Sequence, residues 1–62
     1  MFTEAEQVTI EQFRGINTKL AYNNLARIYT KHTGEKVAGC GCKAQQRQAF
    51  LTMFYEWYEE NN

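Results

Sequence analysis

The chain has 62 residues, nine aromatic side chains and no net charge at neutral pH. A chain this short buries only about 60% of the surface that its unfolded form exposes, which excludes a large core with a deep catalytic cleft. It has no apolar run of about 18 residues and no basic segment followed by an apolar one, so we expect neither a membrane span nor a signal peptide.

Glycines divide the chain into three segments, because they occur only at residue 15 and between residues 34 and 41. No proline interrupts the segments, and apolar residues recur in them at helical spacing. We therefore predict one all-α domain over residues 1–62, built as a small three-helix domain with an aromatic-rich core. The predicted helices span about residues 4–14, 17–33 and 43–60.

The first helix has two candidate starts. Thr9 with Gln12 has the spacing of a capping box, and Thr3 with Glu6 offers an earlier one. In either case we expect the helix to end near Gly15.

The second segment is amphipathic at 100° per residue. Its apolar stripe consists of Ala21, Leu25, Ile28, Tyr29 and His32. Gly34 then stands where a C-cap glycine belongs, so we expect a left-handed residue there that ends the helix.

The third segment carries an apolar arc of about 200°, whereas a helix that lies on a core needs only about 100°. Something beyond the core should therefore cover part of it. Trp and Tyr are enriched as anchors at protein interfaces. We predict that this edge of the helix binds a partner through Met53, Tyr55, Trp57 and Tyr58.

The basic residues suggest an alternative function, because all seven lie between positions 14 and 47. A small nucleic-acid-binding domain would use the basic start of the third helix, where Arg and Gln side chains can read base edges. The residues of this alternative face are Lys43, Arg47, Arg27, Lys31 and Gln46. The sequence pI of about 6.5 favours it less than protein binding.

The segment from His32 to Lys36, HTGEK, resembles the linker that follows the last metal-binding histidine of C2H2 zinc fingers. The resemblance covers five residues, and both cysteines of this chain come after it rather than before. No metal-binding or base-reading residue of that family carries over. We interpret HTGEKVAGCGC as a helix-to-helix connection with Val37 as its apolar anchor.

Cys40 and Cys42 are separated by one glycine, and with His32 they are the candidate metal ligands. Three ligands leave a tetrahedral zinc site incomplete, so we expect no metal and no cofactor. A disulfide between them would cross-link nothing distant. We therefore expect reduced thiols and a cytoplasmic or other intracellular location, which includes the interior of a virion. A reactive thiol beside Lys43 is the remaining alternative.

These observations predict a non-enzymatic interaction module that binds a protein partner or assembles with itself. No nucleophile and base stand at a catalytic spacing. The compact, aromatic-rich composition is similar to that of small proteins encoded by phages, which would make it a virion component or a host-factor-binding protein.

Overall fold

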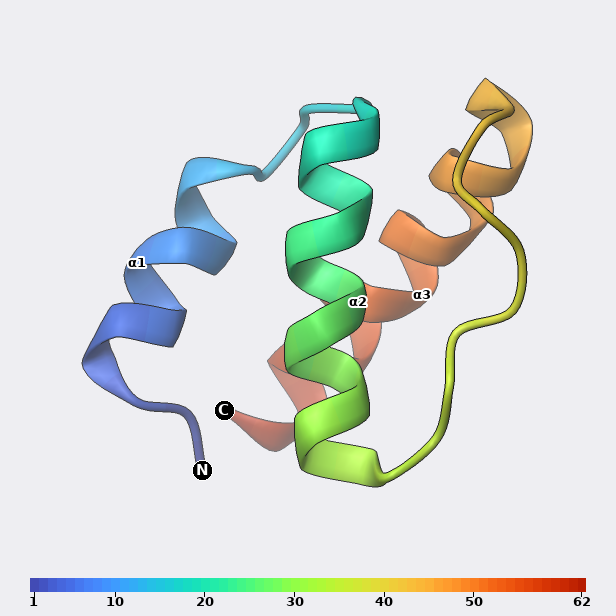
Figure 1. Cartoon of the computed structure of the whole chain (residues 1–62). Coiled ribbons are helices and arrows are strands. Elements are labelled where there is room, and N and C mark those ends of the chain that lie inside the picture. Colours follow the sequence, from blue (N-terminus) through green and yellow to red (C-terminus); the bar gives the residue numbers. More distant parts are fainter.

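The computed structural model describes the whole chain, from residue 1 to residue 62, and contains three helices and no strand. The helices are α1 (Glu4–Gln12), α2 (Lys19–Thr33) and α3 (Ala44–Asn61) (Figure 1). The predicted all-α fold of three helices around an aromatic core is confirmed. None of the helices combines the length and the apolar composition that crossing a lipid bilayer requires.

α1 begins at the earlier of its two candidate starts. The Thr3 hydroxyl accepts the backbone N–H of Glu6 at 3.1 Å, and the Glu6 carboxylate accepts the N–H of Thr3 at 3.0 Å. This capping box satisfies two N–H groups that have no partner inside the helix. The predicted start at Thr9 is wrong, because Thr9 lies within the helix and its hydroxyl donates to the carbonyl of Ala5.

The turn between α1 and α2 is longer than the sequence indicated. α1 already ends at Gln12, and α2 begins only after Thr18, whose hydroxyl accepts the N–H of Ala21 at 3.1 Å. At its other end, α2 stops at Gly34 as predicted. That glycine has a φ of 75°, and its N–H donates to the carbonyl of Thr30 at 2.8 Å.

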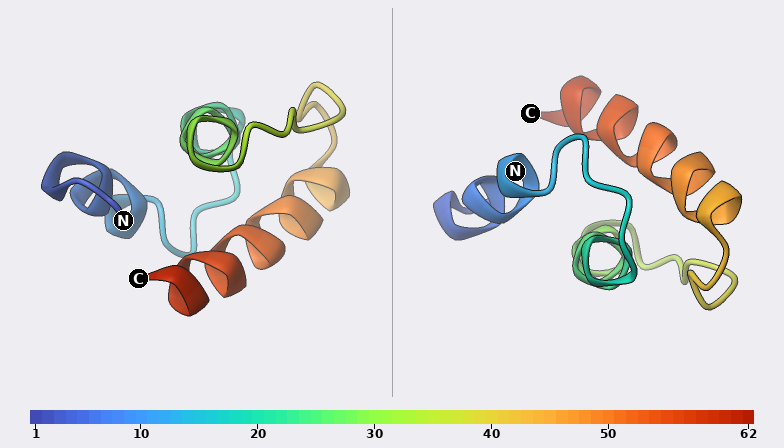
Figure 2. Two further views of the ribbon diagram at one scale, coloured as in Figure 1. Left: turned by 90° about the horizontal axis from the view of Figure 1, so that it is seen from below. Right: turned by 90° about the horizontal axis from the view of Figure 1, so that it is seen from above.

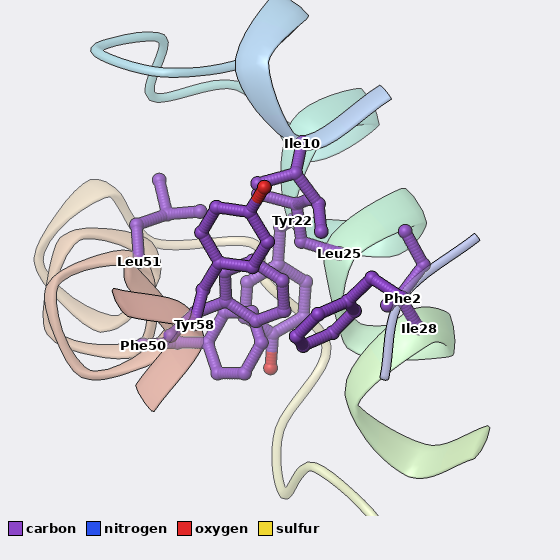
Figure 3. Packing of buried hydrophobic residues seen from close by; sticks show 9 residues of the cluster. Phe2, Ile10, Tyr22, Leu25, Ile28, Phe50, Leu51 and Tyr58 are labelled. Carbon is purple, nitrogen blue, oxygen red and sulfur yellow. The ribbon is translucent and has the colours of Figure 1, made fainter. Parts of the chain in front are cut away.

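The core lies mainly between α2 and α3, with one residue from α1 and one from the segment before it (Figure 3). Phe54, Leu25 and Ile10 are completely buried. The remaining members of the cluster are Phe2, Tyr22, Ile28, Phe50, Leu51 and Tyr58. Two aromatic pairs of the cluster, Phe2 with Tyr58 and Tyr22 with Phe50, meet edge to face, an arrangement that adds to the stabilisation from buried apolar area.

Phe2 covers part of the wide apolar arc on α3. It is only 5% exposed, and its ring lies 5.2 Å from that of Trp57 and 4.9 Å from that of Tyr58, measured between ring centres. Phe2, two residues before the start of α1, therefore covers Trp57 and Tyr58 from within the same chain. Figures 1 and 2 show the consequence, since the two ends of the chain lie next to each other.

The connection between α2 and α3 spans residues 34–43 and runs back along the outside of the helix pair (Figure 1). Val37 packs against the core cluster, as predicted. Gly39 and Gly41 have φ values of 90° and 71°, so the chain bends there in a conformation that other residues rarely adopt.

Candidate functional site

A groove runs along one flank of α3, beside the turn that joins α1 to α2. It begins in a hollow of about 210 Å³, lined by Arg14, Gly15, Ile16, Gln48, Leu51, Thr52 and Tyr55. Tyr55 also lines a shallower hollow together with three carboxylates of α3, Glu56, Glu59 and Glu60. Because the two hollows share Tyr55, we treat them as one feature and name it the α3 groove.

The side chain of Asn17 holds the α1–α2 turn against α3. Its amide nitrogen donates to the carbonyl of Ala44 at 3.1 Å, and its oxygen accepts from Nε of Arg47 at 2.7 Å. The neighbouring residue, Ile16, is thereby placed at the edge of α3, where it stays 42% exposed. A large apolar side chain is thus held in the solvent by polar contacts on the residue that follows it.

Tyr55 links both ends of the groove and also attaches α3 to α1. Its hydroxyl donates to the carbonyl of Ile10 at 2.7 Å, which gives a partner to a carbonyl in the last turn of α1. The guanidinium carbon of Arg14 lies 4.8 Å from the centre of the Tyr55 ring. Burial raises the pKa of Tyr55 to about 12, so the phenol is neutral at physiological pH.

The groove is negatively charged at the end formed by Glu56, Glu59 and Glu60. At the other end, Arg14 forms an ion pair with Glu11, with Nε–Oε1 and Nη2–Oε2 distances of 2.8 and 2.9 Å. The guanidinium holds the pKa of Glu11 below its ordinary value. Glu59 approaches the same guanidinium only at 3.5 Å. Glu56 and Glu60 form no ion pair. An approaching cation would therefore be attracted to the end of α3.

The structure scatters the four predicted partner-binding residues, Met53, Tyr55, Trp57 and Tyr58. Tyr58 is only 2% exposed, so its predicted contact with a partner is wrong. Trp57 is half-buried, with its ring centre 4.9 Å from that of Tyr29. Met53 remains 38% exposed. It lies roughly 200° around the helix from Tyr55, on the other flank of α3.

The residues of the nucleic-acid alternative do not form one basic face. Arg47 lies near the start of α2, because its guanidinium is bonded to Asn17 and also donates to the carbonyl of Gly41 at 2.9 Å. Lys31 lies near the other end of α2, where its Nζ is 3.2 Å from the Glu6 carboxylate. About 18 Å of helix separates these ends. Lys43, Gln46 and Arg27 are exposed but stand outside both contacts.

His32 faces α1 rather than the cysteines. Its Nε2 lies 3.0 Å from Oε1 of Glu6, and its ring centre is 4.6 Å from that of Phe2. The N–H of Thr3, together with His32 and Lys31, lowers the pKa of Glu6 to about 2. No three His, Cys, Asp or Glu side chains lie close enough together to form a metal-binding group.

Cys40 and Cys42 form a disulfide in the structure, so the prediction of reduced thiols is wrong. Their Cα atoms are 5.3 Å apart, inside the range of about 4.4–6.8 Å that disulfides require. Although such a bond cross-links nothing distant, Gly41, with its φ of 71°, lets the chain fold back so that the two side chains meet.

Sequence reasoning missed the turn side of the groove, formed by Arg14 and Ile16. The available signal was an isoleucine directly after Gly15, at the junction of two helices, where a polar residue is expected. The position of that isoleucine against Leu51 depends on packing between segments far apart in the sequence, which a single helical pattern does not contain.

The chain matches no protein-family model, and neither the curated proteins nor the solved structures contain a significant match to it.

Proposed function

We propose that the chain is a non-enzymatic protein-binding module whose α3 groove receives a segment of the partner. The observation that carries this proposal is the exposed side chain of Ile16 beside a hollow of about 210 Å³ that leads to three carboxylates. Sites for drug-sized ligands measure about 300–1,000 Å³. The hollow beside Ile16 is smaller than that and suits one apolar side chain, whereas the open hollow beside the carboxylates measures about 610 Å³.

The charges along the groove indicate the chemistry of the partner. An apolar side chain would enter between Ile16 and Leu51, and the same segment would carry Lys or Arg to reach Glu56 and Glu60. Charge complementarity of this kind gives specificity and accelerates association more than it adds affinity. The partner is therefore expected to present an apolar residue followed by a basic cluster.

The hydroxyl groups in the groove support binding rather than catalysis. The Thr52 hydroxyl accepts from Nε2 of Gln48 at 3.2 Å, and the Tyr55 hydroxyl donates to a backbone carbonyl. Neither has a histidine or a free carboxylate within hydrogen-bonding distance to activate it.

Selection from a library of random peptides would test the proposal. We expect the selected peptides to share an apolar residue followed by Lys or Arg, and to shift the amide NMR signals of Ile16, Leu51 and Tyr55. Binding should weaken as salt rises, because exposed carboxylates attract the basic residues. Peptides that shift only signals outside the groove, or a selection that yields no consensus, would contradict the proposal.

A matched pair of variants distinguishes binding at the groove from non-specific hydrophobic binding. Ile16→Asp places a charge at the hollow and should abolish binding. Val8→Asp changes a comparably exposed apolar residue, 59% exposed on α1, and should leave binding intact. Sedimentation of the unmodified chain and of both variants shows whether the partner is a second copy, since only Ile16→Asp should then dissociate the assembly.

A further inference from the structure

The Cys40–Cys42 disulfide lies in the α2–α3 connection, apart from the residues of the α3 groove. Both cysteines are exposed, whereas Gly41 between them is buried. Thiol–disulfide exchange begins when a thiolate attacks one sulfur of the pair, so its rate depends on access to that sulfur. The exposure of both residues provides such access.

The disulfide closes a loop through a single residue and joins no distant parts of the chain. In the chain-entropy account, the stabilisation from a disulfide grows with the length of the loop that it closes. Here only Gly41 lies between the two cysteines, so the loop is very short. The bond therefore contributes little to holding the three helices together, and its reduction should leave them in place.

Other contacts hold the loop backbone where it is. A Cβ added at Gly41 would lie 2.8 Å from Cε2 of Tyr22, which shows how closely the loop sits on that ring. The Tyr22 hydroxyl donates to the carbonyl of Ala38 at 3.0 Å. On the other side, Nη1 of Arg47 donates to the carbonyl of Gly41 at 2.9 Å. None of these contacts needs the sulfur–sulfur bond.

The charges near the loop are mostly positive. Lys36 and Lys43 flank it in the sequence, and Glu35 is the only acid between residues 14 and 47. The disulfide also stands immediately before α3, whose N-cap residue, Lys43, forms no side-chain cap. Positive charge and the first N–H groups of a helix both stabilise a thiolate, which is the leaving group in exchange.

We propose that Cys40 and Cys42 form a reversible redox site that exchanges with glutathione while the loop stays folded. A glutathione thiolate bonds to one sulfur, and the sulfur–sulfur bond breaks to release the other cysteine as a thiolate. A second glutathione thiolate then attacks the glutathione sulfur of the mixed disulfide, which forms oxidised glutathione and releases the second cysteine thiolate. The two glutathiones together lose two electrons and two protons, and the cysteine pair gains both.

Glutathione buffers of increasing reduced-to-oxidised ratio test this site, with alkylation of free thiols and intact mass as the readout. We expect conversion from no labelled cysteine to two within the glutathione series, with an unchanged helical circular dichroism spectrum at both ends. Reduction by dithiothreitol alone would identify an inert structural disulfide. Two labelled cysteines even in oxidised glutathione would show that the pair does not form. Reduction accompanied by loss of helix would also overturn the proposal.

One variant tests the formation of the mixed disulfide, and a pair of arginine variants tests whether the contact of Arg47 with the loop assists exchange. Cys42→Ser should accumulate a mixed disulfide of Cys40 with glutathione, because the internal resolving thiol is gone. Arg47→Gln removes the bond to the Gly41 carbonyl and should slow reoxidation of the reduced pair several-fold, whereas Arg27→Gln, at an exposed position outside the loop, should not. Equal reoxidation rates in both arginine variants would show that the loop is not held for exchange.

Discussion

Two segments of this chain are attached to the α2–α3 pair by different chemistry. Beyond its buried Ile10, α1 is held by ionisable side chains: Glu6 contacts Lys31 and His32, and just after the helix Arg14 lies over Tyr55. The α2–α3 connection is held by glycine conformation and by close packing on Tyr22. A fall in pH should therefore loosen the first segment, whereas added side-chain volume should loosen the second.

The largest expected effect is at the connection, in the variant Gly41→Ala. The added methyl group would collide with the Tyr22 ring, and alanine would have to adopt the left-handed conformation of a residue with a φ of 71°. We expect a loss of about 3 kcal/mol in the free energy of unfolding, from about 1–2 kcal/mol for the backbone and the rest for overpacking. Urea unfolding followed by circular dichroism measures it.

Gly34→Ala is the matched control for that variant. Gly34 has a similar φ of 75°, but a Cβ there would meet nothing within 4 Å. Gly34→Ala should therefore lower the free energy of unfolding only by the cost of the left-handed backbone conformation, about 1–2 kcal/mol. If the two variants unfold at the same urea concentration, the connection is not packed closely on Tyr22.

The sequence predicted the glycines of the connection but not what they contact. Gly34 could be assigned from the end of an amphipathic pattern, because helix C-caps are local. The close approach of Gly41 to Tyr22 joins residues from α2 and the loop, and Tyr22 did not belong to the predicted apolar stripe. Such a contact depends on how helices pack, and this information is absent from a pattern within one segment.

The second expected effect is at α1 and depends on pH. The pKa of Glu6 is about 2 in the folded chain, below its ordinary value of 4.5. A carboxylate with a lowered pKa stabilises the fold fully above its ordinary pKa, and this stabilisation is lost as the pH falls from about 5 towards 2. Lys31 is 66% exposed, so solvent screening weakens the contact. We expect a loss of about 1–2 kcal/mol.

Urea unfolding at a series of pH values measures this loss, and two variants assign it. Glu6→Gln should be less stable than the unmodified chain at neutral pH and should show a flatter dependence on acid. Glu4→Gln, in the same helical turn but exposed and without an ion pair, should reproduce the unmodified curve. If the stability of Glu6→Gln depends on pH in the same way as that of the unmodified chain, carboxylates other than Glu6 account for the acid sensitivity.

The site was less predictable than the fold, for a reason visible on α3. The helical pattern predicted an apolar arc on the third helix, and Phe50, Leu51, Phe54 and Tyr58 of that arc are buried. The excess width of the arc predicts a binding edge, whereas Phe2 covers Trp57 and Tyr58 of that edge inside the same chain. A pattern on one helix shows that a surface needs covering. It does not show whether the cover is a partner or a residue about fifty positions earlier in the sequence.

The smallest expected effect compares one hydroxyl in each segment. Tyr55→Phe removes the bond to the carbonyl of Ile10, and Tyr22→Phe removes the bond to the carbonyl of Ala38. Each should cost about 1 kcal/mol, the usual net value of one hydrogen bond. Their total stabilities will therefore be similar, and hydrogen exchange is needed to distinguish them. Tyr55→Phe should accelerate amide exchange in α1, and Tyr22→Phe should accelerate it in residues 35–43, because each variant releases the segment that its hydroxyl holds. Acceleration spread evenly over all three helices in both variants would mean that the two segments do not open separately, and that the difference in their attachment has no effect on local stability.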